Sequence, residues 1–188
     1  YKGRSMADLP ERLMRAMAQY GGGSVVLELR RGEVKALEEA LRVIADPKSD
    51  KLMRLQYIEI IGQVPNARAI PVLLGIVKSE PGDDLRRAAL GALKPYNDER
   101  IYKAVIAVFS EMSGGLRKIA GTLLAGRSDW AFELLRLVDN GDLAASLISA
   151  EVVSLLRSYK DIQVKQLLAK HFAGSEMDSV RMEKEIQR

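Results

Sequence analysis

The run LRRAALGALK at residues 85–94 aligns without gaps with two other stretches of the chain, MRLQYIEIIG at 53–62 and LRKIAGTLLA at 116–125. The motif therefore recurs after 32 residues and then after 31 residues. Each copy has an apolar residue, an arginine, and apolar residues three, six and seven positions after that arginine. This spacing predicts a helix buried along one face. A fixed period of this length indicates stacked helical units and not one closed core.

A second helix is expected in each unit, over residues 66–77, 98–109 and 129–138. Pro71 suits the first turn of the first of these, Asp98 suits the N-cap of the second, and Ser128 or Asp129 suits the N-cap of the third. Short breaks at 63–65, 95–97 and 126–127 separate the paired helices, and looser links at 78–84 and 110–115 separate the units. The repeated unit is therefore an antiparallel pair of helices.

The regularity decreases on both sides of this stretch. We expect helices over 8–20, ended by a flexible joint at Gly21–Gly23, and over 33–45, closed by Asp46-Pro47. A longer insertion at 139–146 precedes a last pair over 149–159 and 161–172, and residues 175–188 are expected to be a polar tail or the start of a linker.

The fold class that follows is all-α, a right-handed α-α superhelix of about five helix pairs between residues 8 and 174. The predicted solenoid domain covers residues 1–174, with the clearest repeats at 50–80, 83–112 and 114–141 and irregular caps at 8–47 and 149–172.

The composition limits the chemistry that the chain can perform. Of the 188 residues, 47% are hydrophobic but only 5% are aromatic, which disfavours an all-β domain. The absence of cysteine excludes disulfides, thiolate zinc sites, CxxCH haem attachment and cysteine nucleophiles, and a single histidine, His171, makes a histidine-rich metal site or a Ser–His triad a poor hypothesis. We therefore expect no catalytic, cofactor-binding or metal-ligating residue in this segment.

The net charge of +4 raises the question of nucleic-acid binding. The excess is spread as +1, +2, 0 and +1 over residues 1–50, 51–100, 101–150 and 151–188. Binding to a phosphate backbone needs a basic stripe that displaces several counterions together. The arginine and lysine doublets at 30–31, 86–87 and 117–118 are flanked by carboxylates, so nucleic acid is a disfavoured partner.

The recurring positions are interpreted as structural. The arginines could line a groove for an acidic partner, but a ladder of guanidinium groups bonded to carbonyls or carboxylates of neighbouring turns is favoured, with Asp50, Asp83 and Asp84 as caps or partners. These structural positions are Arg54, Arg86 and Arg117, together with Leu85, Ala89, Leu93, Leu116, Ala120 and Leu124.

Three other features can each be interpreted in two ways, as functional or as structural. Trp130 could mark a base-excision site, but its apolar neighbours favour packing. His171 is expected at a helix C-terminus, where a cation is favourable, and a role as haem ligand for a neighbouring domain has no support. The carboxylate pairs Glu38-Glu39 and Asp83-Asp84 are adjacent in sequence and lack the facing geometry of an acid/base pair.

The repeated blocks resemble HEAT repeats (an armadillo-like family) of the short bacterial type, which also occur in phycobilin-lyase-like proteins. The first-helix pattern apolar-Arg-x-x-Ala-x-x-Ala-Leu is matched best by residues 85–93. The block at 116–124 has Leu123 in place of the second alanine, and the block at 53–61 has Tyr57 and Ile60 at the two alanine positions.

Residues 85–188 are also similar to the HEAT region of large secreted bacterial proteins that carry a sugar-dehydrogenase-like propeller and a C-terminal c-type haem domain. The resemblance rests on LRKIAGTLLAGRSDWA at 116–131, NGDL at 140–143, VVSLLR at 152–157 and KHF at 170–172. It implies a parent oxidoreductase or electron-transfer protein outside the cytoplasm, with haem c in an adjacent domain and none in this segment. The first residue is Tyr1, which leads us to expect a processed product or an excised part of a longer chain.

The function expected is a non-catalytic scaffold that binds other proteins or neighbouring domains of the same chain, with no membrane span. Two alternatives stay open, a HEAT-like nucleic-acid-binding protein of the DNA glycosylase type and a phycobilin-lyase-like protein acting on a tetrapyrrole. The partner, the face that binds it and the oligomeric state are not determined by the sequence, and the compartment is secreted or periplasmic if the family resemblance holds.

Overall fold

The computed structural model describes residues 23–173, with side chains from residue 25 onward, and every regular element in that range is helical. Single 3-10 turns lie at Ala67–Ala69 and Ala145–Leu147. The ten α-helices of this range are α2 (Gly23–Arg30), α3 (Val34–Ala45), α4 (Lys51–Gln63), α5 (Ile70–Ser79), α6 (Asp83–Ala92), α7 (Glu99–Val108), α8 (Gly114–Leu124), α9 (Ser128–Asp139), α10 (Ala150–Arg157) and α11 (Ile162–Phe172).

Five of the ten described α-helices begin where a short polar side chain accepts a hydrogen bond from the first turn. Asp50 accepts from the backbone N–H of Met53 at α4 (2.9 Å), and Asp98 accepts from that of Arg100 at α7 (2.9 Å). Ser113, Ser149 and Asp161 cap α8, α10 and α11 in the same way. Pro71 lies in the first turn of α5, as expected, because that turn has no use for its missing N–H.

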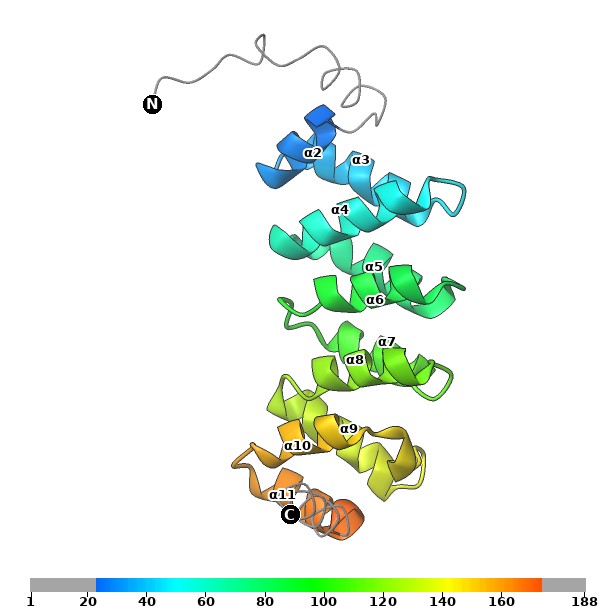
Figure 1. The fold of residues 1–188 in the computed structure, drawn as a ribbon. Coiled ribbons are helices and arrows are strands. Elements are labelled where there is room, and N and C mark those ends of the chain that lie inside the picture. Colours follow the sequence, from blue (N-terminus) through cyan, green and yellow to red (C-terminus); the bar gives the residue numbers. More distant parts are fainter. Residues whose placement is uncertain (1–22, 174–188) are drawn as a thin grey trace, which may run out of the picture.

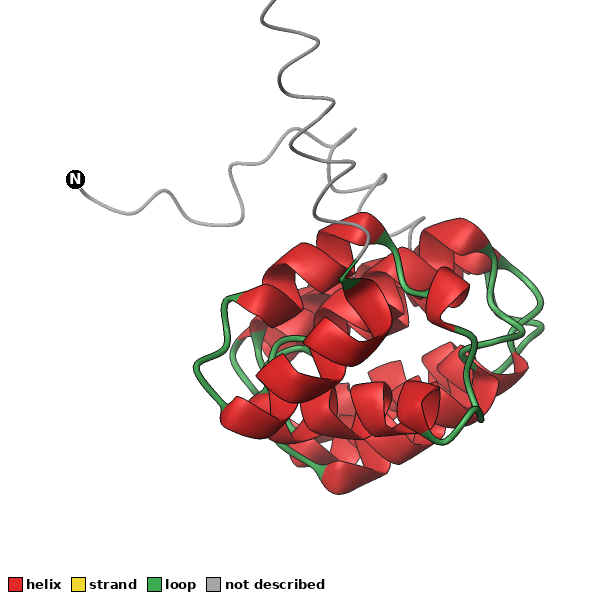
Figure 2. Cartoon of the chain, turned by 90° about the horizontal axis from the view of Figure 1, so that it is seen from below, coloured by secondary structure: helices red, strands yellow, loops and turns green. Residues whose placement is uncertain are grey.

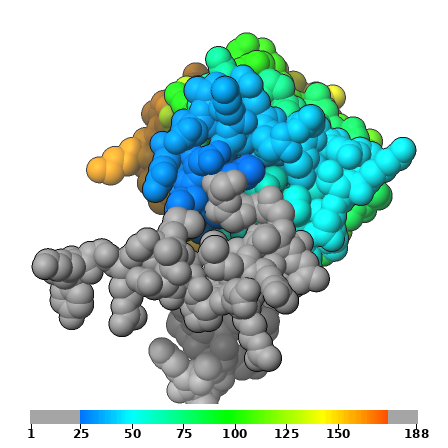
Figure 3. All heavy atoms as spheres, turned by 90° about the horizontal axis from the view of Figure 1, so that it is seen from above, coloured from blue at the N-terminus to red at the C-terminus, as the bar shows by residue number. Residues whose placement is uncertain are grey.

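The helices form two rows that run along the chain (Figure 1). In the row of first helices, α4 packs on α6, α6 on α8 and α8 on α10; in the row of second helices, α3 packs on α5, α5 on α7 and α9 on α11. Seen from below, the helices lie in two layers with the loops gathered at their ends (Figure 2). The space-filling view from above shows α2 and α3 in blue at one end of the stack (Figure 3).

The three aligned blocks occupy equivalent places, on α4, α6 and α8, each the first helix of a consecutive pair. Their apolar positions face the interior, which extends from Leu29 to Phe172 as one continuous core. The predicted positions Leu85, Ala89, Leu93, Leu116, Ala120 and Leu124 are all buried. No helix within residues 23–173 is long and apolar enough to cross a bilayer.

Helix α2 is an element that the sequence analysis did not predict. Its first residue, Gly23, was expected to belong to a flexible joint, but the structure begins a helix there. Leu29 of α2 is buried, and α2 packs against both α3 and α4. Tertiary packing therefore stabilises a segment whose glycine-rich start argued against a helix.

The first pair of the described range is α2 with α3. The helix expected over 8–20 and the tail expected over 175–188 lie outside the described residues.

The N-cap of α9 is also a correction. The cap residue is Arg127, without a side-chain cap bond, and both Ser128 and Asp129 lie inside the first turn. The guanidinium of Arg127 donates to the carbonyl oxygen of Lys94 (3.2 Å) in the preceding unit and lies over the Trp130 ring (4.6 Å to the centroid). The bond to Lys94 is a long-range contact of the N-cap residue, and a propensity argument cannot reveal it.

Candidate functional site

The recurring arginines bond the C-terminal ends of the preceding helices. Arg54 Nε donates to the carbonyl oxygen of Ile44 in the last turn of α3 (3.0 Å), and Arg86 Nε donates to that of Val77 in the last turn of α5 (2.9 Å). Arg117 Nη1 donates to the carbonyl oxygen of Met112, just after α7 (2.5 Å). The last carbonyls of a helix have no partner within the helix, so Arg54 and Arg86 each supply a missing donor, whereas Arg117 bonds carbonyls of the loop that follows α7. These contacts are those of the structural interpretation.

Arg54 differs from the other two in its burial. Its side chain is 4% exposed and forms an ion pair with Glu80 (Nη2–Oε2 2.7 Å), whose side chain is 15% exposed. The carbonyl bond and the ion pair together satisfy a charged group that would otherwise be costly to bury.

A second ladder joins the turns between paired helices, and the sequence analysis missed it. The Tyr96 hydroxyl donates to the carbonyl oxygen of Asn66 (3.1 Å), Arg127 donates to that of Lys94 (3.2 Å), and the Tyr159 hydroxyl donates to that of Ala125 (2.7 Å). Burial raises the pKa of both tyrosine hydroxyls, so they stay protonated donors. The three positions are 31 and 32 residues apart, so the repeat period was the signal that could have revealed them.

Ion pairs connect the first turns of successive first helices. Lys51 Nζ contacts Asp84 Oδ2 (2.6 Å) between α4 and α6, and Lys118 Nζ contacts Glu151 Oε1 (2.6 Å) between α8 and α10. The hydrogen bond from Lys118 lowers the pKa of Glu151 to about 2, and that from Lys51 lowers the pKa of Asp84. Asp50 thus caps α4, as expected, whereas the partner of Asp84 is Lys51 and not one of the recurring arginines. Asp83 accepts a hydrogen bond from the Ser113 hydroxyl (2.6 Å).

His171 lies in the last turn of α11, the expected position. Its Nε2 is 2.6 Å from Asp139 Oδ1, and Lys170 Nζ is also 2.6 Å from that oxygen. These hydrogen bonds lower the pKa of the Asp139 carboxyl. The cluster therefore ties the end of α9 to the end of α11, a link between neighbouring pairs.

The adjacent carboxylates Glu38 and Glu39 bind different partners, Arg68 (3.3 Å) and Arg42, so the pair does not converge on one point. Within the described residues, no three His, Asp or Glu side chains are placed to hold a metal ion.

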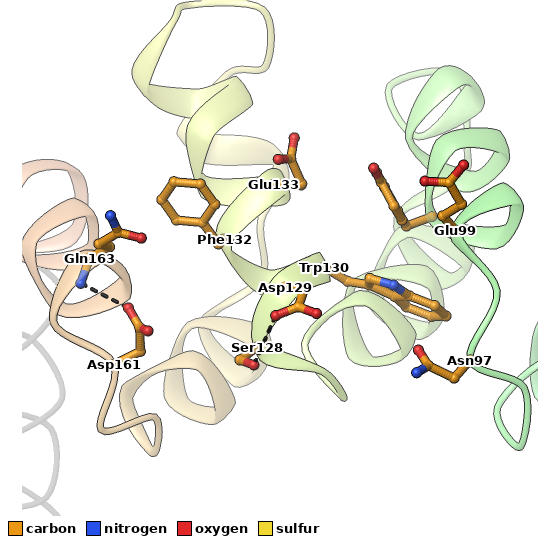
Figure 4. A pocket seen from close by; sticks show the side chains of 10 residues that line it. Asn97, Glu99, Ser128, Asp129, Trp130, Phe132, Glu133, Asp161 and Gln163 are labelled. Carbon is orange, nitrogen blue, oxygen red and sulfur yellow. Dashed lines mark hydrogen bonds between the residues drawn. The ribbon is translucent and has the colours of Figure 1, made fainter.

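A hollow on the surface lies beside Trp130, where the first turns of α7, α9 and α11 meet (Figure 4). We call it the Trp130 groove. Its volume is about 480 Å³, and it is lined by Asn97, Glu99, Tyr102, Ser128, Asp129, Trp130, Phe132, Glu133, Asp161 and Gln163.

Trp130 is a packing residue, as the sequence analysis favoured. It is only 3% exposed, and its ring centroid is 6.1 Å from that of Tyr102 on α7. Arg127 covers the Trp130 ring at 4.6 Å. One edge of the groove is therefore a fixed aromatic wall and not a mobile base-stacking side chain.

Comparisons with known proteins add no relative. The chain matches no protein-family model, and searches of curated proteins and of solved structures also give no match. The site must therefore be interpreted from its own geometry.

Proposed function

We propose that this chain is a non-catalytic scaffold, a right-handed α-α superhelix of HEAT-type helix pairs that holds a protein partner or neighbouring domains of its own polypeptide. The observation that supports this proposal is that the recurring polar side chains form bonds between successive helix pairs. The arginines at the first-helix position and the turn residues Tyr96, Arg127 and Tyr159 bond one pair to the preceding pair. Such residues build a repeated surface, which is the usual binding element of stacked-helix proteins.

The superhelix part of the proposal is tested by shortening the chain. In a stack, each pair depends on its neighbours alone. Removing residues 141–188 deletes α10 and α11, the neighbours of the α8–α9 pair. Helices α2–α7 keep their neighbours and should stay helical and cooperatively folded, as measured by circular dichroism and urea unfolding. Loss of all structure in that variant would show one closed core and overturn the proposed architecture.

The binding function is tested by photo-crosslinking of the intact gene product in the cells that produce it. A photoreactive amino acid is introduced at one exposed position at a time, at Gln163 on a second helix, at Glu59 on a first helix and at Glu111 in a loop. We expect one recurring protein or domain from a single face. Crosslinks at none of the positions, or turnover of a substrate by the purified chain, would contradict the proposal.

We also propose, from the resemblance of residues 85–188, that the intact gene product is a secreted haem-c oxidoreductase or electron-transfer protein and that this segment spaces its other domains. A Cys-x-x-Cys-His sequence beyond Arg188 in the intact gene product would support this parent. Its absence would remove this part of the proposal and leave the scaffold function untouched.

The charge of the Trp130 groove disfavours the nucleic-acid alternative. Four carboxylate side chains and no basic side chain line it, so it would repel a phosphate backbone. A titration of duplex DNA at several salt concentrations should therefore show weak binding with a shallow salt dependence. Tight binding with a steep dependence would favour the alternative.

A further inference from the structure

The Trp130 groove lies at a discontinuity in the row of second helices. Helix α5 packs on α7 and α9 packs on α11, whereas the backbone contact between α7 and α9 is much weaker. The rings of Tyr102 and Trp130 fill the space between these two helices. Because two large rings occupy the contact, the helices stand apart and leave a hollow at the surface.

The lining of this hollow is acidic, and the nearby cations neutralise it incompletely. Lys103 pairs with Glu99 (3.0 Å) and Arg136 pairs with Glu133 (2.7 Å). Within residues 25–173, the Asp129 carboxylate forms no ion pair and accepts a hydrogen bond from the Ser128 hydroxyl (3.3 Å). Asp129 is exposed, so its charge is open to a ligand.

The lining also offers an apolar contact next to that charge. Phe132 is half-buried and projects from α9 toward Gln163 of α11, on the other side of Asp129 from Trp130 (Figure 4). A ligand that contacts both groups needs a positive charge beside an apolar side chain.

We propose that the Trp130 groove docks a basic segment of a protein partner, with an arginine or lysine of that segment on Asp129 and an adjacent apolar side chain on Phe132. The inference rests on the proposed scaffold function and names its site and the chemistry of its partner. An exclusively apolar helix fits less well, because it would remove water from four carboxylates without replacing their hydrogen bonds. The acidic lining repels nucleic acid and acidic peptides.

The experiment uses Trp130 as its own reporter, because it is the only tryptophan of the chain. The full chain is titrated with a capped hexapeptide of alternating arginine and leucine, and separately with the glutamate–leucine counterpart. Trp130 emission and the anisotropy of a dye on the peptide are recorded at low and at high salt. We expect the basic peptide to bind and to shift the emission, with weaker binding at high salt.

Two charge-neutralising variants test the site. Asp129→Asn should weaken binding of the basic peptide by up to about fivefold, the upper end of the range for one exposed ion pair. Glu111→Gln, which removes an exposed carboxylate outside the groove, should leave the affinity unchanged. Phe132→Ala should weaken binding of the arginine–leucine peptide more than that of an arginine–glycine peptide of equal length. Circular dichroism checks that each variant is folded.

Equal affinity for the acidic peptide, no binding of the basic peptide, or equal effects of Asp129→Asn and Glu111→Gln would overturn the inference. The scaffold proposal is judged separately by the crosslinking experiment. Crosslinks from another face together with any of these results would leave the scaffold function standing and remove the groove as its site.

Discussion

The junction between α4 and α6, in the row of first helices, and the junction between α7 and α9, in the row of second helices, present different surfaces. Both are hollowed to a similar size, about 410 Å³ and about 480 Å³. The first is lined mainly by aliphatic and small residues, including Gly62 and Ala92, and a Cβ placed on Gly62 would lie 3.2 Å from the Ala92 Cα atom. The second is aromatic and acidic. The size of the side chains at a contact thus influences how closely successive helices of a row approach each other.

The arginine ladder shows the same contrast along the chain. Arg54 is buried with Glu80, whereas Arg117 bonds carbonyl oxygens near the surface. One repeat position therefore carries a buried ion pair in one unit and a more exposed bond to loop carbonyls in another.

The largest effect is expected at the open junction. Trp130→Ala should lower the free energy of unfolding by about 3 kcal/mol, because a buried aromatic ring is lost and a cavity is left. Phe132→Ala, at a half-buried ring, should cost about 1 kcal/mol. Urea unfolding followed by circular dichroism measures both. Equal costs would mean that Trp130 does not hold this junction together.

Arg54→Ala should cost about 2–3 kcal/mol, because it leaves Glu80 and the Ile44 carbonyl group without their donor in a buried place. Arg117→Ala should lower the free energy of unfolding by about 1 kcal/mol, since its bonds to the Met112 and Ser110 carbonyl oxygens are part-buried and exposed, and water can replace the lost donor there more easily. Urea midpoints of the two variants sharpen the contrast within the ladder. A larger loss for Arg117→Ala would reverse it.

Two glycines differ in the space around them, because Gly121 lies in close contact with a neighbouring helix and Gly91 faces open space. In α8, a Cβ on Gly121 would meet Val152 Cγ2 of α10 at 2.8 Å, whereas a Cβ on Gly91 of α6 meets nothing within 4 Å. Gly121→Ala should therefore destabilise the chain by about 1–2 kcal/mol, because the β-branched valine cannot move aside. Gly91→Ala should stabilise it by about 0.5 kcal/mol. Thermal unfolding of both variants is the measurement, and a gain for Gly121→Ala would show that α10 packs more loosely than its contacts indicate.

The smallest effect is a pH dependence at the α8–α10 junction. Glu151 has a pKa of about 2 in the folded chain against an ordinary value of 4.5. The unfolded chain therefore takes up the proton first, and the stability contributed by the Lys118–Glu151 pair is complete above about pH 4.5 and is lost as the pH falls toward 2. The free energy of unfolding, measured between pH 6 and pH 2, should fall less steeply with falling pH for Glu151→Gln than for the unchanged chain. Glu111→Gln serves as the control. Superimposable curves for all three proteins would rule out this linkage.

The helix pairs, their order and their buried stripes were predictable because periodicity and capping are local properties of the sequence. The blocks at 53–62, 85–94 and 116–125 fall on α4, α6 and α8, and Asp98 caps α7 as expected. The errors occur where a distant contact decides. Helix α2 packs with its Leu29 buried against later helices, and the N-cap residue of α9, Arg127, is bonded to the distant Lys94 carbonyl oxygen.

For the site, the sequence by itself determined that Arg54, Arg86 and Arg117 are equivalent and that Trp130 packs. Tertiary structure decided which polar groups meet between units: Tyr96 with Asn66, Tyr159 with Ala125, and His171 with Asp139. It also decided that a groove opens between α7 and α9. The physical reason is that a repeat fixes positions along the chain, whereas the distance between neighbouring helices depends on the volume of the side chains packed between them.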